Sequence, residues 1–335
     1  MQTTGLFPNT RLRRLRGNAS LRSLVQETSL NINKLVLPLF IKHGKGIKHP
    51  IASMPGHFQL SIDQLEEEIK SICDLGIKYI ILFGIPLNKD ACGSEGYSDK
   101  GIIQMALPII KKIAPDLLVI TDVCCCEYTD HGHCGIIDSE KSNTEIYVDN
   151  DKSLDLLVRS AVSHAKAGAD IIAPSANMDG MVIRIREGLD AAGFQHLPIL
   201  SYSAKYASSM YGPFRQAAEG TPQYGDRKTY QMDYGNAAEA LRECALDIAE
   251  GADMLMVKPA HTYLDIIHRV KSEFPYLPLA AYHTSGEFAM IKAAAEKGWI
   301  DEKNSVLEIL TAIQRAGADF IISYYAKEVA EWANF

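Results

Sequence analysis

The sequence predicts an α/β protein folded as a (β/α)8 TIM barrel. Short apolar runs alternate with longer amphipathic stretches along its 335 residues, which is typical of repeated βα units around a parallel sheet. Eight runs have this character, and eight units with right-handed crossovers close most simply into a barrel. A doubly wound open sheet is the alternative, although no GxGxxG turn follows the first run to support it.

The apolar runs and their periodicity place the elements in order. Strands are expected at residues 35–41, 79–84, 117–124, 170–176, 198–203, 253–259, 278–283 and 319–325. Helices are clearest at 62–75, 154–166, 237–250 and 305–315. Four helices end in a glycine shortly before the next strand, which favours the left-handed conformation that ends a helix: Gly76, Gly168, Gly251 and Gly317. The last three begin the same Gly-Ala-Asp tripeptide.

The chain is expected to contain one catalytic domain and two appendages. Residues 34–335 have the length and apolar content of one barrel. Residues 1–33 form an N-terminal arm whose basic run TRLRRLR is too brief for a targeting segment, so we expect it to pack on a partner subunit; a transit-peptide fragment or a nucleic-acid arm is the alternative. Residues 206–234 are long for a barrel loop and predict a lid, with a plain solvated loop as the alternative.

Composition narrows the classes of partner. A net charge of -7 argues against a protein that coats nucleic acid. The longest apolar runs are far shorter than the roughly 18 residues of a membrane helix, so we expect no membrane partner. Seven cysteines in so long a chain do not resemble a secreted disulfide framework, and we expect a reducing cytoplasm.

Cysteines gather where the third expected strand ends, a position at which catalytic groups of barrels collect. Strand alternation would direct Cys124 and Cys126 to one face, where Cys134 of the following loop joins them. Three thiolates suit zinc and leave a fourth position open, as in catalytic zinc sites. Three loop residues are alternative or supporting ligands: Asp130, His131 and His133. The competing interpretation is a packing thiol, which we assign to the remaining cysteines: Cys73, Cys92, Cys125 and Cys244.

Two lysines lie at the ends of the fifth and sixth expected strands. Lys205 and Lys258 are surrounded by apolar, aromatic and small residues, so burial should favour the neutral amine that forms a Schiff base. Adjacent strands are about 5 Å apart, so the two charges should also repel each other. One lysine would suggest a class I aldolase, whereas two suggest an enzyme with two carbonyl substrates. A phosphate-binding or salt-bridged lysine is the alternative for either residue alone.

Further polar residues would contact an acidic substrate. In the expected lid, Arg215 and Arg227 suit carboxylates because guanidinium groups bind them bidentately. Other strand ends supply hydroxyl groups for a carboxylate and an acid for an ammonium group: Ser175, Ser285, Tyr324 and Asp122.

Together these residues resemble the family of porphobilinogen synthase, also called 5-aminolevulinate dehydratase. The matching stretches, in family order over nearly the whole chain, are TDVCCCEYTDHGHCG (121–135), SYSAKYASSMYGPFR (201–215), GDRKTYQM (225–232), GADMLMVKPA (251–260) and AYHTSGEFAM (281–290). The resemblance implies a hydro-lyase of heme biosynthesis that condenses two 5-aminolevulinate molecules to porphobilinogen with loss of two waters. It also implies a barrel whose N-terminal arm embraces a neighbour in a homo-octamer.

The resemblance also implies residue roles. Lys258 would bind the substrate that becomes the propionate side of the product, and Lys205 the one that becomes the acetate side. Cys124, Cys126 and Cys134 match the zinc ligands of the zinc-type enzymes. The remaining matches are carboxylate-binding residues of the lid (Arg215, Arg227, Gln231), residues for the other carboxylate (Ser285, Tyr324), residues near the amino group (Asp122, Ser175), and the carboxylate of a distant magnesium site that favours the octamer (Glu243).

One strand end departs from the family pattern. Where the family usually has PSDMMDGR, this chain has PSANMDGM, so Ala176 replaces an acid and Met181 an arginine. Losing both members of a possible ion pair leaves no unpaired buried charge, so we expect local repacking and intact chemistry. A class I Schiff-base aldolase and a noncatalytic homologue are the rival functions, but the aldolase leaves one lysine and the three cysteines without a role.

Overall fold

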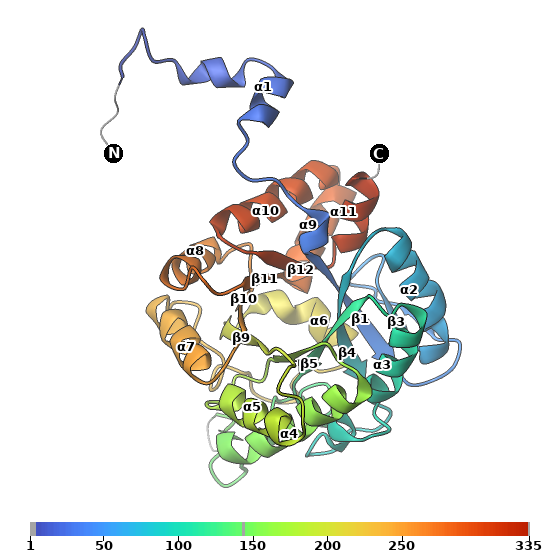
Figure 1. Ribbon diagram of the computed structural model, residues 1–335. Helices are drawn as coiled ribbons and strands as arrows, with labels where there is room; N and C mark the ends of the chain where they lie inside the picture. Colours follow the sequence, from blue (N-terminus) through green and yellow to red (C-terminus); the bar gives the residue numbers. More distant parts are fainter. Residues whose placement is uncertain (1–4, 143–144, 334–335) are drawn as a thin grey trace.

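Eight parallel strands close into a barrel in a computed structural model of the protein, which describes residues 5–142 and 145–333 (Figure 1). The barrel strands are β1 (Leu35–Lys42), β4 (Tyr79–Ile85), β5 (Leu118–Val123), β8 (Ile171–Pro174), β9 (Leu200–Lys205), β10 (Met254–Lys258), β11 (Leu279–His283) and β12 (Phe320–Ser323). They pair in the order β8, β5, β4, β1, β12, β11, β10, β9, and a parallel bridge between Ile172 and Ile199 joins the two ends. The predicted barrel and all eight expected strands are confirmed.

Most of the helices surround the barrel, whereas α1 lies on the N-terminal segment away from it (Figure 1). The helices are α1 (Ala19–Leu24), α2 (Leu65–Asp74), α3 (Ile102–Ile113), α4 (Asn150–Ala167), α5 (Met181–Ala191), α6 (Gly212–Ala217), α7 (Ala238–Ala249), α8 (Leu264–Glu273), α9 (Ser285–Glu296), α10 (Glu302–Ala316) and α11 (Ala326–Ala333). The four expected helices correspond to α2, α4, α7 and α10. Within residues 5–142 and 145–333, none of the helices combines the length and apolar character needed to span a membrane.

Short strands and a short helix lie at the end of the barrel where the parallel strands have their carboxyl ends. β2 (Lys48–Pro50) and β3 (Phe58–Leu60) form an antiparallel hairpin beside β1, and β6 (Ile136–Ile137) pairs with β7 (Val148–Asp149). The short helix α6 lies within the segment 206–234. These additions raise the rim where the site lies.

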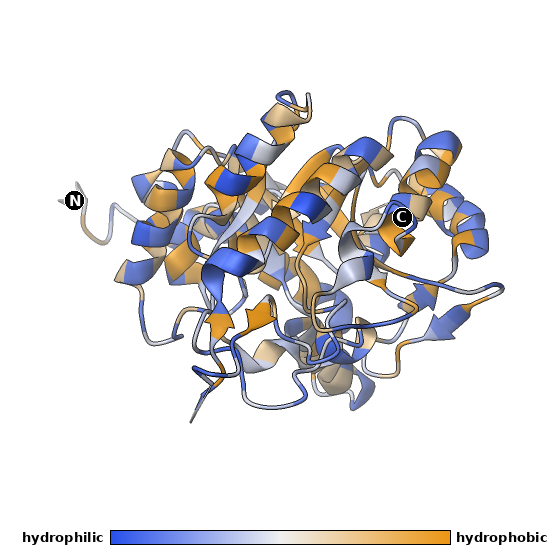
Figure 2. Cartoon of the chain, turned by 90° about the horizontal axis from the view of Figure 1, so that it is seen from below, coloured by the Kyte–Doolittle hydropathy of each residue, from blue (hydrophilic) through white to orange (hydrophobic). Residues whose placement is uncertain are grey.

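The core follows from apolar strands that are covered on both faces. Strand residues such as Leu35, Ile80 and Val119 are fully buried. Helix α2 buries Leu65 and Ile69 and exposes Glu66 and Glu67. Figure 2 shows the same division, with apolar residues concentrated in the barrel strands and polar residues on the outward parts of the helices. Parallel strands buried on both faces are typical of this fold.

The repeated glycines end helices as predicted. Gly76, Gly168, Gly251 and Gly317 all have positive φ, from 78° to 127°, a conformation that disfavours residues with a Cβ atom. The Asp of each Gly-Ala-Asp tripeptide then bonds twice to the preceding barrel strand. The carboxylates accept hydrogen bonds from strand N–H groups at 2.7–2.8 Å, and the Asp N–H groups donate to the carbonyls of the same strand residues: Asp170 to Val119, Asp253 to Ile199 and Asp319 to Leu279. The tripeptide thereby joins neighbouring strands at their beginnings.

Most of the segment 5–34 extends away from the barrel (Figure 1), whereas Leu30 and Ile32 pack against the core. This segment exposes apolar side chains, with Leu6 at 80%, Phe7 at 74% and Leu12 at 70% exposure. Its arginines, such as Arg13 and Arg14, are also exposed. That the segment packs on another subunit stays a prediction.

Removing the strand-joining carboxylate of Asp253 should destabilise the barrel. Asp253→Ala deprives the Ile199 N–H of its acceptor, and we expect the free energy of unfolding to fall by about 1–2 kcal/mol. Asp253→Asn keeps an acceptor oxygen and serves as the control, with a smaller loss. Urea unfolding measures both variants, and equal stability of Asp253→Ala and the wild type would contradict the role.

Candidate active site

Two lysines lie side by side where their strands end. Lys205 is the last residue of β9 and Lys258 the last residue of β10, and they are register partners in the parallel sheet. Both side chains are buried, with residue exposures of 4% and 6%. The predicted pairing of the two amines at the barrel mouth is therefore confirmed as geometry.

Aromatic rings enclose the amine of Lys258. Its Nζ lies 4.1 Å from the ring centroid of Tyr282 and 5.1–5.3 Å from those of Tyr202, Tyr211 and Phe214. Burial, reinforced by the positive charge of Lys205, lowers the pKa of Lys258 from 10.5 to about 7. A substantial fraction of this amine is therefore neutral at neutral pH and can act as a nucleophile.

A short hydrogen-bond chain connects Lys205 to Asp122. The Lys205 amine donates to the carbonyl oxygen of Ser175, and the Ser175 hydroxyl donates to Oδ2 of Asp122 at 2.9 Å. Burial and the nearby charge of Glu127 raise the pKa of Asp122 to about 7. Its Oδ1 is buried without a hydrogen-bond partner among the described residues. Asp122 therefore presents an unpaired acceptor that suits a substrate ammonium group or a proton in transit.

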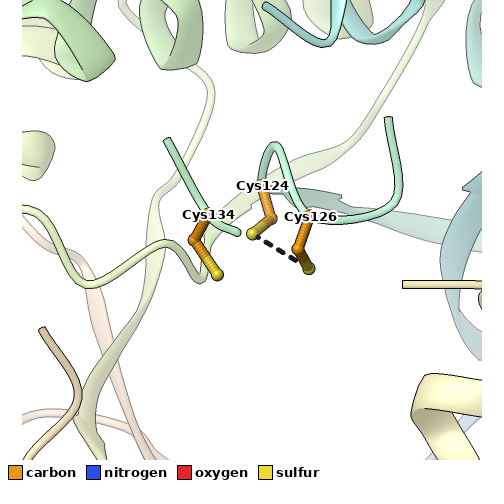
Figure 3. A group of neighbouring side chains, drawn as sticks. All are labelled: Cys124, Cys126 and Cys134. Atoms are coloured by element: carbon orange, nitrogen blue, oxygen red, sulfur yellow. Dashed lines mark hydrogen bonds between the residues drawn. The ribbon is translucent and has the colours of Figure 1, made fainter. Parts of the chain in front are cut away.

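Three cysteines converge beside these lysines. The Sγ atoms of Cys124, Cys126 and Cys134 lie within 4.8 Å of one another, and all three residues are at most 4% exposed (Figure 3). β5 ends at Val123, so Cys124 and Cys126 lie in the turn that follows it and not on the strand. The predicted cluster is confirmed, but the strand alternation used to predict it is the wrong reason. The turn brings the two Sγ atoms to 3.4 Å.

The cluster suits a thiophilic metal ion. Zinc–sulfur bonds of about 2.3 Å require thiolates separated by roughly 4 Å, as three Sγ atoms within 4.8 Å can be. Hydrogen bonds from Cys124 and Cys126 lower the pKa of Cys134, whereas burial raises the pKa of Cys124. The charge of Arg227 also favours the Cys134 thiolate. Three soft sulfur donors in a buried site suit a thiophilic metal ion.

The two histidines of the cysteine loop bond to protein groups. His133 contacts the Tyr230 hydroxyl through Nδ1 at 3.0 Å and the Tyr224 carbonyl through Nε2 at 2.9 Å. The Nδ1 atom of His131 accepts from the His133 N–H at 3.1 Å. Asp130 is exposed. His133 therefore attaches the cysteine loop to the segment 206–234, and the three-residue metal group includes none of Asp130, His131 and His133.

The other cysteines divide into two kinds. Cys125 and Cys244 are buried, as expected of packing thiols. Cys73 and Cys92 are exposed, so the packing interpretation is wrong for these two. Each lies at a surface turn or helix end, which apolar patterning does not distinguish from the core.

The sequence interpretation missed Glu127, which is 3% exposed and directly follows the cysteines. The Cys126 thiol lies 3.3 Å from Glu127 Oε2, and burial together with Cys126 raises the pKa of Glu127 to about 8. Neither spacing nor periodicity marked Glu127, which is one of several acids in this stretch. Tyr202 and Tyr282 were also missed, because buried tyrosines are common in cores.

The segment 206–234 supplies a second polar region. A cavity of about 550 Å³ is lined by residues that include Arg215, Arg227 and Gln231. Arg227 is 5% exposed and its Nη2 donates to the carbonyls of Gly132 at 2.9 Å and Gly220 at 2.8 Å. Gln231 is 3% exposed, and neither polar atom of its amide has a partner among the described residues. Unpaired buried polar atoms lining a cavity favour a polar ligand there.

Ser285 and Tyr324 lie elsewhere on the rim. Ser285 begins α9, and its Oγ accepts from the Phe214 N–H at 2.9 Å. The Tyr324 hydroxyl is fully buried and lies 3.1 Å from that of Tyr282, one of the rings around Lys258. Both residues therefore contact the surroundings of Lys258.

Glu243 lines a second, smaller cavity, which shares Tyr202 with the surroundings of Lys258. It is on α7 and lines a small cavity with Asp179 and Asp247, and burial together with Asp247 raises the pKa of Glu243 to about 7. Met181 lines the same cavity, while Ala176 is fully buried nearby in sequence. The two residues that differ from the family pattern, Ala176 and Met181, are thus apolar and buried, and neither carries a charge that would need a partner.

Comparisons with known proteins agree on one family. The family model described as delta-aminolevulinic acid dehydratase matches residues 9–332. Proteins of that name from Halalkalibacterium halodurans and Bacillus subtilis are 56% and 53% identical to the chain over 324 and 322 residues, covering 97% and 96% of it and 97% of each relative. The solved delta-aminolevulinic acid dehydratase (porphobilinogen synthase) of Toxoplasma gondii, in complex with the reaction product porphobilinogen, is 44% identical with a TM-score of 0.92, covering 96% of this chain and 91% of that one.

The buried amine of Lys258 should reduce stability at neutral pH. Its folded pKa of about 7 lies below the ordinary 10.5, so between these values the unfolded chain binds more protons and the free energy of unfolding rises with pH. We expect Lys258→Met to be more stable than the wild type at pH 7 by on the order of 4 kcal/mol. The difference should vanish near pH 10.5. Urea unfolding at both pH values tests this.

An exposed lysine provides the control for that experiment. Lys48→Met, on the exposed strand β2, should show no such pH-dependent gain. A gain for Lys258→Met that is equal at both pH values would mean that improved packing, and not proton linkage, is the cause.

Proposed function

The chain belongs to the delta-aminolevulinic acid dehydratase family, and we propose that Lys205 and Lys258 bind the two 5-aminolevulinate molecules that it condenses to porphobilinogen. The observation that supports this most strongly is the register pairing of two buried lysines beside three converging thiols. An enzyme that joins two copies of one ketone needs two places to hold a carbonyl group, and a pair of amines supplies them.

Lys258 begins the proposed reaction. Its neutral amine attacks the ketone carbon of one 5-aminolevulinate, and loss of water gives a Schiff base. This substrate becomes the propionate side of the product. Lys205 holds the second molecule in the same way, and that molecule becomes the acetate side. Carbon–carbon and carbon–nitrogen bond formation between the two, with release of both lysines and loss of a proton, completes the pyrrole.

Asp122 is placed to handle protons and the substrate amino group. With a pKa of about 7 it holds a proton in part of the molecules and releases it in the rest. Its free Oδ1 accepts from an ammonium group, and its Oδ2 is already oriented by Ser175. The two residues thus direct the amino group of a substrate toward the lysines.

Two sets of polar groups hold the substrate carboxylates. The carboxylate of the substrate on Lys205 would bind to Arg215, Arg227 and Gln231. Two guanidinium groups and an amide without a hydrogen-bond partner line the cavity there. Ser285 and Tyr324 would take the carboxylate of the substrate on Lys258. The segment 206–234 acts as a lid that carries the first set and closes over the bound pair.

Two metals belong to the proposal. Cys124, Cys126 and Cys134 would hold Zn²⁺, which supplies a Lewis acid and lowers the pKa of a bound water or amine when present. Glu243 would hold Mg²⁺ with its acidic neighbours, because a partly buried carboxylate whose pKa is raised to about 7 gains from a divalent cation. Its effect would be on assembly, as the resemblance to the family implies.

Assembly and location complete the proposal. The exposed apolar residues of segment 5–34 gain by burial against another copy of the chain, which supports an arm that joins subunits of a homo-octamer. We place the enzyme in the cytoplasm, since its metal site needs three cysteines as thiolates, and in tetrapyrrole biosynthesis, where porphobilinogen is consumed.

Product formation and its dependence on metal test the function. We expect porphobilinogen to form from 5-aminolevulinate, activity to be lost after removal of metal with a strong chelator, and activity to return with zinc. Cys126→Ala should lose the response to zinc, whereas Cys244→Ala, at a buried cysteine outside the cluster, should keep it. Spectrophotometry of porphobilinogen formation measures the activity of the wild type under each condition and of both variants.

The rival functions give different results in the same experiment. Porphobilinogen formation that is unchanged by the chelator would support the synthase activity but contradict the metal role of the cysteines. Cleavage of phosphorylated sugars after chelation would indicate a Schiff-base aldolase. A protein that forms no product, and that borohydride does not link to 5-aminolevulinate, would be a noncatalytic homologue.

A further inference from the structure

We propose that Glu219 is a positioning residue that latches the lid to the barrel rim and so orders Arg215 and Arg227. The inference rests on the proposed function for its effect on substrate binding, but the latch itself is a property of the chain. Glu219 follows α6 within the segment 206–234. Among the described contacts it has none with Lys205 or Lys258, and it belongs to neither carboxylate-binding set.

Three elements of the rim converge on Glu219. Its Oε1 accepts from the Lys42 amine, at the end of β1, and from the Gln59 amide of β3 at 3.2 Å. Its backbone carbonyl accepts from the Lys89 amine, in the loop after β4. Gln59 also donates to the Ala217 carbonyl at 2.8 Å. The end of α6 is thus attached to three barrel elements that are distant in sequence.

Gly220, the next residue, connects the contacts of Glu219 to both arginines through hydrogen bonds. The Gly220 N–H donates to the Arg215 carbonyl at 3.0 Å, and the Gly220 carbonyl accepts from Arg227 Nη2 at 2.8 Å. A Cβ atom on Gly220 would lie 3.1 Å from the Cys126 carbonyl, so the turn passes close to the cysteine loop. Fixing residue 219 therefore fixes one hydrogen-bond partner of each arginine next to the cysteines.

The backbone of Glu219 favours a role for its side chain. Its φ is +53°, a conformation that glycine adopts readily and that glutamate adopts at a cost. Only Asn177 shares this feature among the non-glycine residues that the structure describes. The side chain makes contacts that can offset this cost, because it joins Lys42 and Gln59.

The exposure of the ion pair suits a contact that opens and closes. The side chains of Lys42 and Glu219 are 29% and 42% exposed, so water and salt reach both. Such pairs contribute modestly and exchange easily with solvent. The pair also borders a cavity of about 490 Å³ between the β2–β3 hairpin and α6, which leaves room for the segment to move.

Two substitutions at residue 219 separate the side chain from the backbone. Glu219→Gln keeps the shape and removes the charge, whereas Glu219→Gly relieves the backbone and removes every side-chain contact. We expect both to raise the KM for 5-aminolevulinate about three- to tenfold with little change in kcat, because a loosened lid binds the carboxylate less well. Glu67→Gln, which breaks the exposed pair between Lys48 of the hairpin and Glu67 of α2, is the matched control and should leave KM unchanged.

Trypsin provides a readout that does not depend on activity. Cleavage after Arg215 and Arg227, located by mass spectrometry, should be faster in both Glu219 variants than in the wild type and the control. The exchange Lys42→Glu with Glu219→Lys should restore part of the protection and of the KM, which a purely structural role would not produce.

Three results would contradict the latch. They are unchanged cleavage and KM in both Glu219 variants, a fall in kcat at constant KM, and an exchange variant no better than Glu219→Lys alone. A wild-type protein that makes no porphobilinogen would overturn the proposed function instead, and the cleavage rates would still decide whether Glu219 holds the lid.

Discussion

The parallel register between β9 and β10 is the constraint on which the site depends. It ends two adjacent strands in lysine at the same level, so Lys205 and Lys258 are forced together in a buried barrel mouth. Two ammonium groups there would repel each other and lack water, and the pKa of Lys258 falls to about 7 in response. The backbone hydrogen bonds that pair the two strands thus determine the environment that makes the Lys258 amine reactive.

Residues around the two lysines offset the positive charge that is buried there. Asp122 and the cysteine cluster contribute negative charge near the lysines, while Arg227 in turn favours the Cys134 thiolate. The segment 206–234 covers the group and adds unpaired polar atoms at Gln231. The Gly-Ala-Asp tripeptides join the strands at the opposite end, so rigidity and chemistry occupy different ends of the barrel.

The sequence predicted most of the fold because local signals recur. Apolar runs marked all eight barrel strands, and Gly76 and Gly168 ended helices where glycine was needed. Adjacent strand ends also brought Lys205 and Lys258 together in the prediction. The reason given for Cys124 and Cys126 was wrong, since they lie in a turn. Predicting that turn requires knowing where β5 ends, which apolar runs place only approximately.

Other residues had no local signal at all. Glu127 becomes important through burial beside Cys126, and Glu219 through contacts with Lys42 and Lys89 that are more than a hundred residues away in sequence. Such contacts exist only once the barrel has closed. The pH dependence of Schiff-base trapping tests the central claim directly. Borohydride with 5-aminolevulinate should label Lys258 with a midpoint near pH 7, and a midpoint near the ordinary lysine pKa of about 10.4 would contradict the account.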